Sequence, residues 1–104
     1  MLDCNSKNLD DSGVDGILNV FVPHLIDSLR LVSLRDNRLT KVPHKIRLFS
    51  QLNRLNLGYN QLTSVKTGDF NFSTRRENVR LWLNHNGITY IQPGALDGTK
   101  LNVM

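Results

Sequence analysis

Cysteine is almost missing from this chain, and its scarcity excludes a disulfide-stabilised scaffold. Cys4 is the single cysteine, so no disulfide can form within one chain, although a lone thiol does not define a redox compartment. Long apolar runs are missing as well. The longest candidate, from Ile17 to Leu29, is interrupted by Pro23 and by polar side chains, so a membrane-spanning helix is not expected. The first residues have neither the positive charge nor the apolar stretch of a secretory signal.

Motifs for catalysis and metal binding are missing too. His24, His44 and His85 fall in separate segments without paired ligand spacing, which argues against zinc. The stretch from Asp11 to Val22 is a poor calcium loop, because Val22 stands where a bidentate glutamate is required. No nucleophile elbow or phosphate-binding loop occurs. The sequence therefore predicts a protein that is not an enzyme and that uses no cofactor, no metal and no catalytic residue.

What is present is the composition of one small globular domain. The 104 residues include 39% hydrophobic and 21% charged residues, which is ordinary for a folded chain of this size. The 13 basic and 9 acidic residues give a formal charge of +4. This charge favours acidic partners only weakly.

An internal repeat is the main signal. Three segments align on an asparagine, and they read LRLVSLRDNRLTKV, LNRLNLGYNQLTSV and NVRLWLNHNGITYI. The aligned residues, Asn37, Asn60 and Asn86, are 23 and 26 residues apart. A period in this range is typical of repeat architectures, and the longer second spacing comes from an insertion, NFSTRREN, after Phe70.

Each repeat has a physical logic that predicts parallel strands. Residues two apart on a strand share a face, so the aliphatic pairs are expected to point inward: Val32 and Leu34, Leu55 and Leu57, and Leu81 and Leu83. Stacked repeats would bury these pairs together. Each asparagine amide has donors and an acceptor for backbone groups in the turn after its strand. Further core positions are expected on the crossing segments: Val42, Ile46, Phe49, Val65, Phe70, Ile91 and Leu96.

The pattern LxxLxLxxNxL resembles the leucine-rich-repeat family. The resemblance implies an α/β solenoid with short parallel β-strands on the concave face and loops, turns or short helices on the convex face. It divides the chain into an N-terminal cap-like segment (1–28), three repeats (29–98) and the incomplete start of a further repeat (99–104).

The two ends carry less specific patterns. Leu2-Asp3-Cys4-Asn5 is similar to the start of the cap of extracellular family members, whose cysteines form disulfides. Apolar residues between Asp15 and Ser28 recur at helical spacing, but Pro23 argues for a short helix or turn. Leu101, 23 residues after Asn78, predicts a further strand that would continue to Met104.

Candidate binding residues occupy the outward positions of the strands and the turns that follow. Solenoids usually bind partners on this face. Trp82 is either a partner anchor, since tryptophan and arginine dominate interface hot spots, or a local packing residue in cation–π contact with Arg54 or Arg80. The predicted partner-binding residues are Arg35, Asp36, Arg54, Asn56, Tyr59, Arg80, Trp82, Asn84 and His85.

The leading hypothesis is a protein-binding module of an extracellular or cell-surface recognition protein, such as a receptor. That location is implied by resemblance, because PGALDG is similar to a convex segment common in extracellular animal members. Asn71-Phe72-Ser73 is a candidate glycosylation site, so the protein is a candidate glycoprotein. Two alternatives remain: a polyanion binder for sulfated glycan or nucleic acid that uses Arg35, Arg54 and Arg80, and a structural role in which open repeat ends self-associate.

Overall fold

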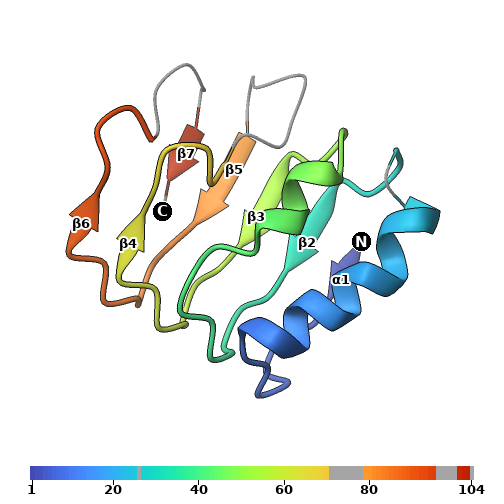
Figure 1. Ribbon diagram of the computed structural model, residues 1–104, viewed down its shortest axis with the longest axis horizontal. Coiled ribbons are helices and arrows are strands. Elements are labelled where there is room, and N and C mark those ends of the chain that lie inside the picture. Colours follow the sequence, from blue (N-terminus) through green and yellow to red (C-terminus); the bar gives the residue numbers. More distant parts are fainter. Residues whose placement is uncertain (26, 71–78, 96–100, 104) are drawn as a thin grey trace.

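Five short strands form one parallel sheet in the computed structural model, which describes residues 1–25, 27–70, 79–95 and 101–103. The sheet order is β1-β2-β3-β5-β7, and its strands lie side by side in Figure 1. The strands are β1 (Leu2–Asp3), β2 (Leu31–Ser33), β3 (Arg54–Asn56), β5 (Val79–Trp82) and β7 (Leu101–Val103). The predicted α/β class with a parallel sheet is confirmed.

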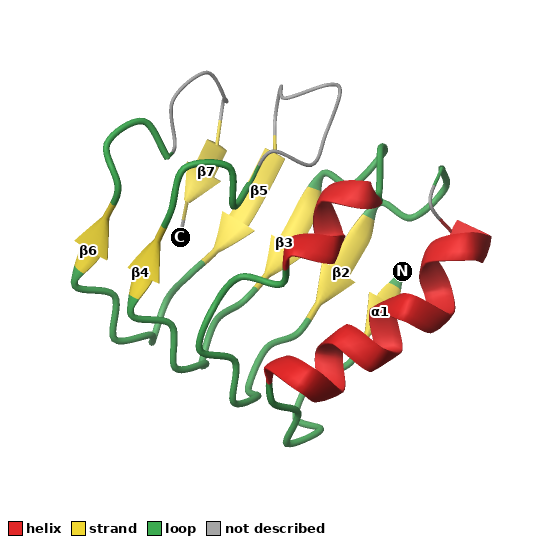
Figure 2. Cartoon of the chain, in the orientation of Figure 1, coloured by secondary structure: helices red, strands yellow, loops and turns green. Residues whose placement is uncertain are grey.

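The segments between these strands cover one face of the sheet. Helix α1 (Asp11–Leu25) and the 3-10 helix η1 (His44–Leu48) lie next to each other, as Figure 2 shows in red. A second, two-stranded parallel sheet follows them, formed by β4 (Ser64–Val65) and β6 (Tyr90–Ile91).

The core lies between the five-stranded sheet and these crossing segments. Val32, Leu34, Leu55, Leu57 and Leu81 are fully buried, as the alternation predicts; Leu83, on the third repeat, is only half-buried. The crossing segments contribute the buried side chains of Val14, Leu18, Val42, Ile46, Phe49, Val65 and Phe70.

Ile91 departs from its predicted core position, because its side chain is 49% exposed. It lies on β6, which pairs with β4 through the registers Ser64–Tyr90 and Val65–Ile91 and forms one edge of the two-stranded sheet. β6 is the outermost of the described crossing segments, whereas β4 has β6 on one side and the preceding crossing segment on the other (Figure 1), which leaves Ile91 less covered than Val65. Leu96, also predicted in the core, is outside the described residues.

The three repeat asparagines form a column beneath the sheet, as predicted. Asn60 Nδ2 donates to the carbonyl oxygens of Leu57 and Leu34, both at 3.0 Å. Asn86 Nδ2 donates in the same way to Leu83 at 3.1 Å and to Leu57 at 2.9 Å. Each amide therefore joins its own turn to the preceding strand.

The first member of the column extends the pattern to the N-terminal segment. Asn37 Nδ2 donates to Leu34 O at 3.0 Å and to Cys4 O at 2.9 Å. Every column member also accepts a backbone N–H from the turn before it; these N–H donors are Leu9 at 2.9 Å, Leu39 at 3.1 Å and Leu62 at 3.0 Å. We call Asn37, Asn60 and Asn86 the asparagine column.

Residues 2–9 imitate one repeat and thereby begin the sheet. Leu2 and Asp3 pair in parallel with Val32 and Ser33, and Cys4 N donates to Ser33 O at 2.9 Å. Cys4 is buried and free. It occupies the place that an inward leucine has in the later repeats, so here the thiol is a core group.

Helix α1 is longer than the sequence predicts. The expectation of a short helix or turn is wrong, because α1 has 15 residues and includes Pro23. Asp10 caps its start by accepting the N–H of Gly13 through Oδ1 at 2.8 Å. Pro23 lies in the last turn, so its missing N–H removes the hydrogen bond to the Asn19 carbonyl but none of those in the earlier turns. Val14 and Leu18 then bury the helix against the core.

The last strand differs from its expected register by one residue. Leu101 lies opposite Val79, and Val103 lies opposite Leu81, whereas the 23-residue spacing from Asn78 places Met104 opposite Leu81. A shift of one residue exchanges the two faces of a strand. The observed register aligns two apolar residues of β7 with Val79 and Leu81, which are both buried in β5.

The asparagine column predicts a stability difference between two asparagines of neighbouring turns. Asn60→Ala should lower the free energy of unfolding by about 1–3 kcal/mol, because it strands buried carbonyl and N–H groups. Asn84→Ala is the control, because Asn84 is exposed and surface substitutions change stability by less than about 0.5 kcal/mol. Urea denaturation of both variants measures the difference, and equal losses would contradict the structural role.

Candidate functional site

The outward side chains of the five-stranded sheet are arranged in straight rows. We call the face that bears them, opposite α1 and η1, the open face. Leu31, Arg54 and Arg80 align in one row, and Ser33, Asn56 and Trp82 align in the next, as predicted. The two arginines are exposed and Trp82 is half-buried. The open face therefore presents guanidinium groups beside an indole ring.

Ser33 differs from the others because it is buried rather than exposed. Its hydroxyl donates to Asn5 Oδ1 at 2.6 Å, and the same oxygen accepts the Arg35 N–H at 3.0 Å. The N-terminal segment thus covers this position. The accessible part of the open face is shifted toward β3 and β5.

In the next row, the side-chain carboxamides of Asn56 and Asn84 surround Gly58. Gly58 N donates to Asn56 Oδ1 at 3.0 Å. A Cβ atom at Gly58 would lie 2.8 Å from Asn84 Oδ1 and 3.2 Å from Asn56 Oδ1. The two carboxamides therefore close over the glycine, and a larger residue at 58 would have to displace Asn84.

A stack of three side chains from three consecutive turns borders the open face. The Arg35 guanidinium carbon lies 4.3 Å from the centre of the Tyr59 ring. The Tyr59 and His85 ring centres are 4.2 Å apart with an interplanar angle of 18°. Offset contacts of this kind hold planar groups in fixed positions. We call Arg35, Tyr59 and His85 the planar stack.

The turn residues that carry this edge adopt an unusual backbone conformation. Asp36, Tyr59 and His85 have φ values of 60°, 56° and 56°. Each directly precedes a member of the asparagine column, which holds the turn in place. Left-handed conformations cost non-glycine residues roughly 1–2 kcal/mol. Strain of this kind is common at functional sites, so the turn edge joins the rows of the open face as the candidate site.

The predicted site residues are therefore brought together, but not with the predicted contacts. The hypothesis that Trp82 packs on Arg54 or Arg80 finds no support, because within the described ranges the cation–π contact is made by Arg35 and Tyr59. Sequence reasoning named both residues and missed their contact. Tyr59 and His85 both stand two residues after an inward leucine, and this shared position was a signal for their contact; Arg35 stands one residue after Leu34, so the repeat gave no such signal for it.

Asp36 lies at the N-terminal end of the same edge and is already hydrogen-bonded. Its Oδ2 accepts the Ser6 hydroxyl at 2.8 Å. Arg38 Nη2 donates to Asn8 O at 3.2 Å. Together with Asn37 these residues line a hollow of about 220 Å³. Asp36 therefore helps to fix the first turns.

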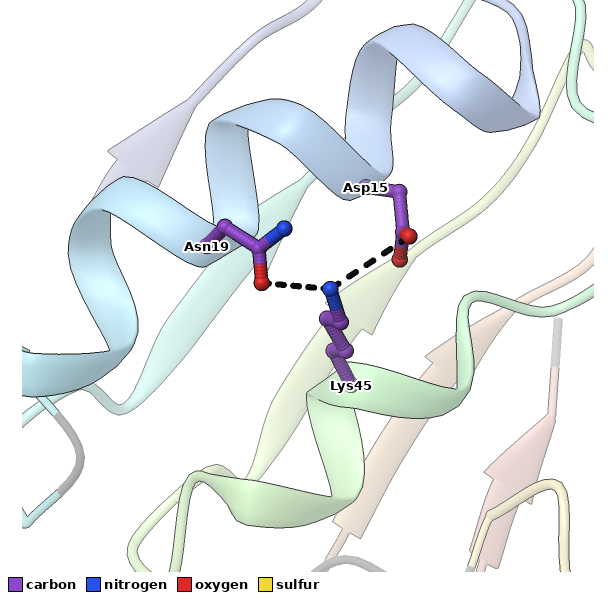
Figure 3. A network of polar contacts seen from close by, with 3 residues as sticks. All are labelled: Asp15, Asn19 and Lys45. Atoms are coloured by element: carbon purple, nitrogen blue, oxygen red, sulfur yellow. Dashed lines mark hydrogen bonds and ion pairs between the residues drawn. The ribbon is translucent and has the colours of Figure 1, made fainter.

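A second hollow, of about 360 Å³, lies between α1 and the segment that leads to η1. Its carboxylates fasten the helix: Asp11 Oδ1 accepts the Thr40 N–H at 3.1 Å. The Asp15 carboxylate is 3.4 Å from Lys45 Nζ, which also contacts Asn19 (Figure 3). This polar network adds to the apolar contacts through which α1 packs against the core.

The Cys4 thiol is not arranged for chemistry. Burial raises the pKa of this thiol, the negative charge of Asp3 raises it further, and Lys7 acts in the opposite direction. A thiol that keeps its proton is a poor nucleophile and metal ligand. In the described part of the chain, no group of three His, Cys, Asp or Glu side chains is placed to hold a metal ion.

Comparisons with protein-family models, with curated proteins and with solved structures find no match for this chain. None of the helices in the described ranges is long and apolar enough to cross a membrane. Asn71, the predicted glycosylation site, is outside the described residues. The geometry of the open face therefore carries the functional argument.

The left-handed backbone at Tyr59 predicts that a glycine variant is more stable there than an alanine variant, which is the reverse of the usual order. Both Tyr59→Gly and Tyr59→Ala remove the ring, but only glycine adopts a positive φ freely. We expect Tyr59→Gly to be more stable than Tyr59→Ala by about 1 kcal/mol. At Gln61, which is exposed and does not have a positive φ, the alanine variant should be more stable by about 0.4–1 kcal/mol. Thermal denaturation of the four variants checks the inversion.

The buried thiol predicts a pH dependence of stability. Because the folded pKa is raised, the unfolded chain loses the Cys4 proton at lower pH than the folded chain. The free energy of unfolding should therefore fall as the pH rises from the ordinary thiol pKa through the raised one. Urea denaturation at neutral and alkaline pH measures this slope. Cys4→Ala should have a smaller slope, and an unchanged slope would show that other groups cause it.

Proposed function

We propose that this protein is a leucine-rich-repeat solenoid and a non-enzymatic protein-binding module whose open face, the concave sheet of such a solenoid, binds another protein. The solenoid assignment is supported by three aligned repeats whose strands pair in parallel and whose asparagines share one hydrogen-bonding pattern. Stacked repeats of this kind present an extended binding surface.

The planar stack is the observation that carries the binding proposal. Its members come from three separate repeats, and Tyr59 is 39% exposed. Rings held in fixed positions lose little conformational freedom on binding, and tyrosine, tryptophan and arginine are the residues that most often dominate binding energy. Trp82 lies on β5 in line with Asn56, so it extends the same surface.

An extracellular or cell-surface location is part of this proposal and depends on resemblance alone. Its basis is the N-terminal Leu2-Asp3-Cys4 and the PGALDG segment. Cys4, whose counterparts in the caps of extracellular family members form disulfides, is buried and has no disulfide within the described residues. Secretion through a glycosylating compartment would make Asn71 a substrate for N-glycosylation, and loss of mass on amidase treatment would reveal it.

Two other functions have an observation in their favour. Arg54 and Arg80 stand side by side, as they would in a polyanion binder, and the affinity of such a protein falls steeply with salt. Tyr90 and Ile91 are 55% and 49% exposed on the edge strand β6, which favours self-association. A sedimentation coefficient that rises with protein concentration would support self-association.

The proposal predicts separate effects on binding and on stability. Protein ligands selected by display on the wild-type chain should lose about 2 kcal/mol or more of binding free energy with Trp82→Ala or Arg54→Glu. The thermal midpoints of both variants should stay near that of the wild type, because the two side chains lie on the open face.

Matched controls lie away from the open face. Tyr90→Ala removes an exposed aromatic ring, and Lys66→Glu makes the same charge change as Arg54→Glu; both residues are exposed. Calorimetric titration with the selected ligands should show unchanged affinity for these controls. Equal losses in controls and open-face variants would contradict binding at the open face, as would a loss of stability that accounts for the lost binding.

A further inference from the structure

Arg54 and Arg80 form a pair of like charges that nothing in the described structure compensates. They lie directly opposite each other on β3 and β5, and both are exposed. Like charges at opposed positions destabilise a sheet. Across the described ranges the ion pair is made elsewhere, by Lys45 and Asp15. A folded chain that keeps this repulsion on its open face has two guanidinium groups ready for an external anion.

Three other cationic groups of the first repeats are engaged within the chain. Lys45 contacts Asp15 and Asn19, Arg38 donates to a backbone oxygen, and the Arg35 guanidinium lies on the Tyr59 ring. Arg54 and Arg80 have no such contact among the described residues. The unpaired charge on the open face is therefore concentrated on these two neighbouring strands.

The geometry suits a small planar anion. Neighbouring strands of a sheet are about 4.8 Å apart, so two guanidinium groups on opposed residues can approach the same carboxylate. Arginine binds carboxylates through paired hydrogen bonds. The indole of Trp82 lies two residues beyond Arg80 on the same face of β5, and it offers apolar surface next to the charge.

Two carboxylates lie at the β1 end of the open face and limit the extent of its basic part. Asp3 lies on β1, and Asp36 follows β2; their oxygens accept hydrogen bonds from Asn5 N at 3.0 Å and from Ser6 Oγ at 2.8 Å. The open face thus changes from acidic at β1 to basic at β3 and β5. A long polyanion that crosses all strands would meet these carboxylates, whereas a short acidic stretch over β3 and β5 would not.

From this arrangement we infer that the partner presents an acidic peptide segment, in which a glutamate or aspartate binds between Arg54 and Arg80 and an adjacent apolar side chain packs on Trp82. The inference rests on the proposed function and specifies the chemistry of the partner. A sulfated glycan or nucleic acid is the alternative that the boundary of carboxylates disfavours.

The test uses the full chain labelled with ¹⁵N and two capped peptides of the same length. One peptide contains glutamate, leucine and serine, and in the other each glutamate is replaced by glutamine. Nuclear magnetic resonance titrations follow the backbone amides of β3 and β5 and the arginine Nε–H groups. We expect the acidic peptide to bind at these residues roughly tenfold more tightly than the neutral one at low salt.

Two double variants with the same change in net charge distinguish binding at the pair of Arg54 and Arg80 from non-specific electrostatic attraction. Arg54→Gln with Arg80→Gln should weaken binding of the acidic peptide roughly tenfold, and it should not lower the thermal midpoint, because it removes a repulsion. Lys41→Gln with Lys66→Gln removes two exposed cations that lie off the open face and should leave affinity nearly unchanged. The single variant Arg80→Gln, with an intermediate effect, replaces the pair if the double variant does not fold.

The outcomes distinguish this inference from the proposed function. Equal binding of both peptides on the open face would overturn the acidic preference and leave protein binding intact. Tighter binding of a sulfated oligosaccharide than of the acidic peptide, at the same arginines, would also overturn it in favour of the polyanion function. If neither peptide nor the oligosaccharide perturbs the open face, the acidic inference fails, whereas the proposed function is decided by the protein ligands selected by display.

Discussion

The rest of this structure depends on the hydrogen bonds that the asparagine column makes to buried backbone groups. Every repeat ends its strand with a turn that enters the interior, where a backbone carbonyl or N–H without a partner is costly. One carboxamide supplies both donors and acceptor at each such turn. Since Leu34 O accepts from Asn37 and Asn60, and Leu57 O from Asn60 and Asn86, neighbouring turns are fixed relative to each other. The column therefore sets the register of the strands above it.

The register in turn creates the open face. Because successive strands align without offset from Leu31 to Arg80, side chains at equal positions of the repeats become neighbours in space. The contact of Tyr59 with His85 exists for this reason, as does the pair formed by Arg54 and Arg80. Both are properties of the stacked repeats, and no single repeat contains either one. Affinity on such a surface depends on groups that are already in position, which lowers the entropy lost on binding.

The opposite side of the molecule holds the parts that the repeat does not specify. Helix α1 is joined to the first repeat by Asp11 at Thr40 and by Asp15 at Lys45, and it covers the core with two fully buried residues. At the other end of the molecule, β6 leaves Tyr90 and Ile91 exposed. The two ends thus differ in how completely the crossing segments cover the core.

The sequence by itself determined the elements that depend on local spacing. The inward leucines, the parallel strands and the asparagine column all follow from a repeated pattern in which period and side-chain chemistry agree. Only the tertiary structure decided the features that depend on neighbours far apart in the chain. Pro23 lies within the last turn of α1, which Val14 and Leu18 bury against the core. β7 is shifted by one residue from its expected register, which aligns its apolar pair with Val79 and Leu81. Ile91 is exposed because β6 is the outermost of the described crossing segments. The contact of Arg35 with Tyr59 belongs to the same group, since a single repeat cannot show which side chains its neighbours bring alongside.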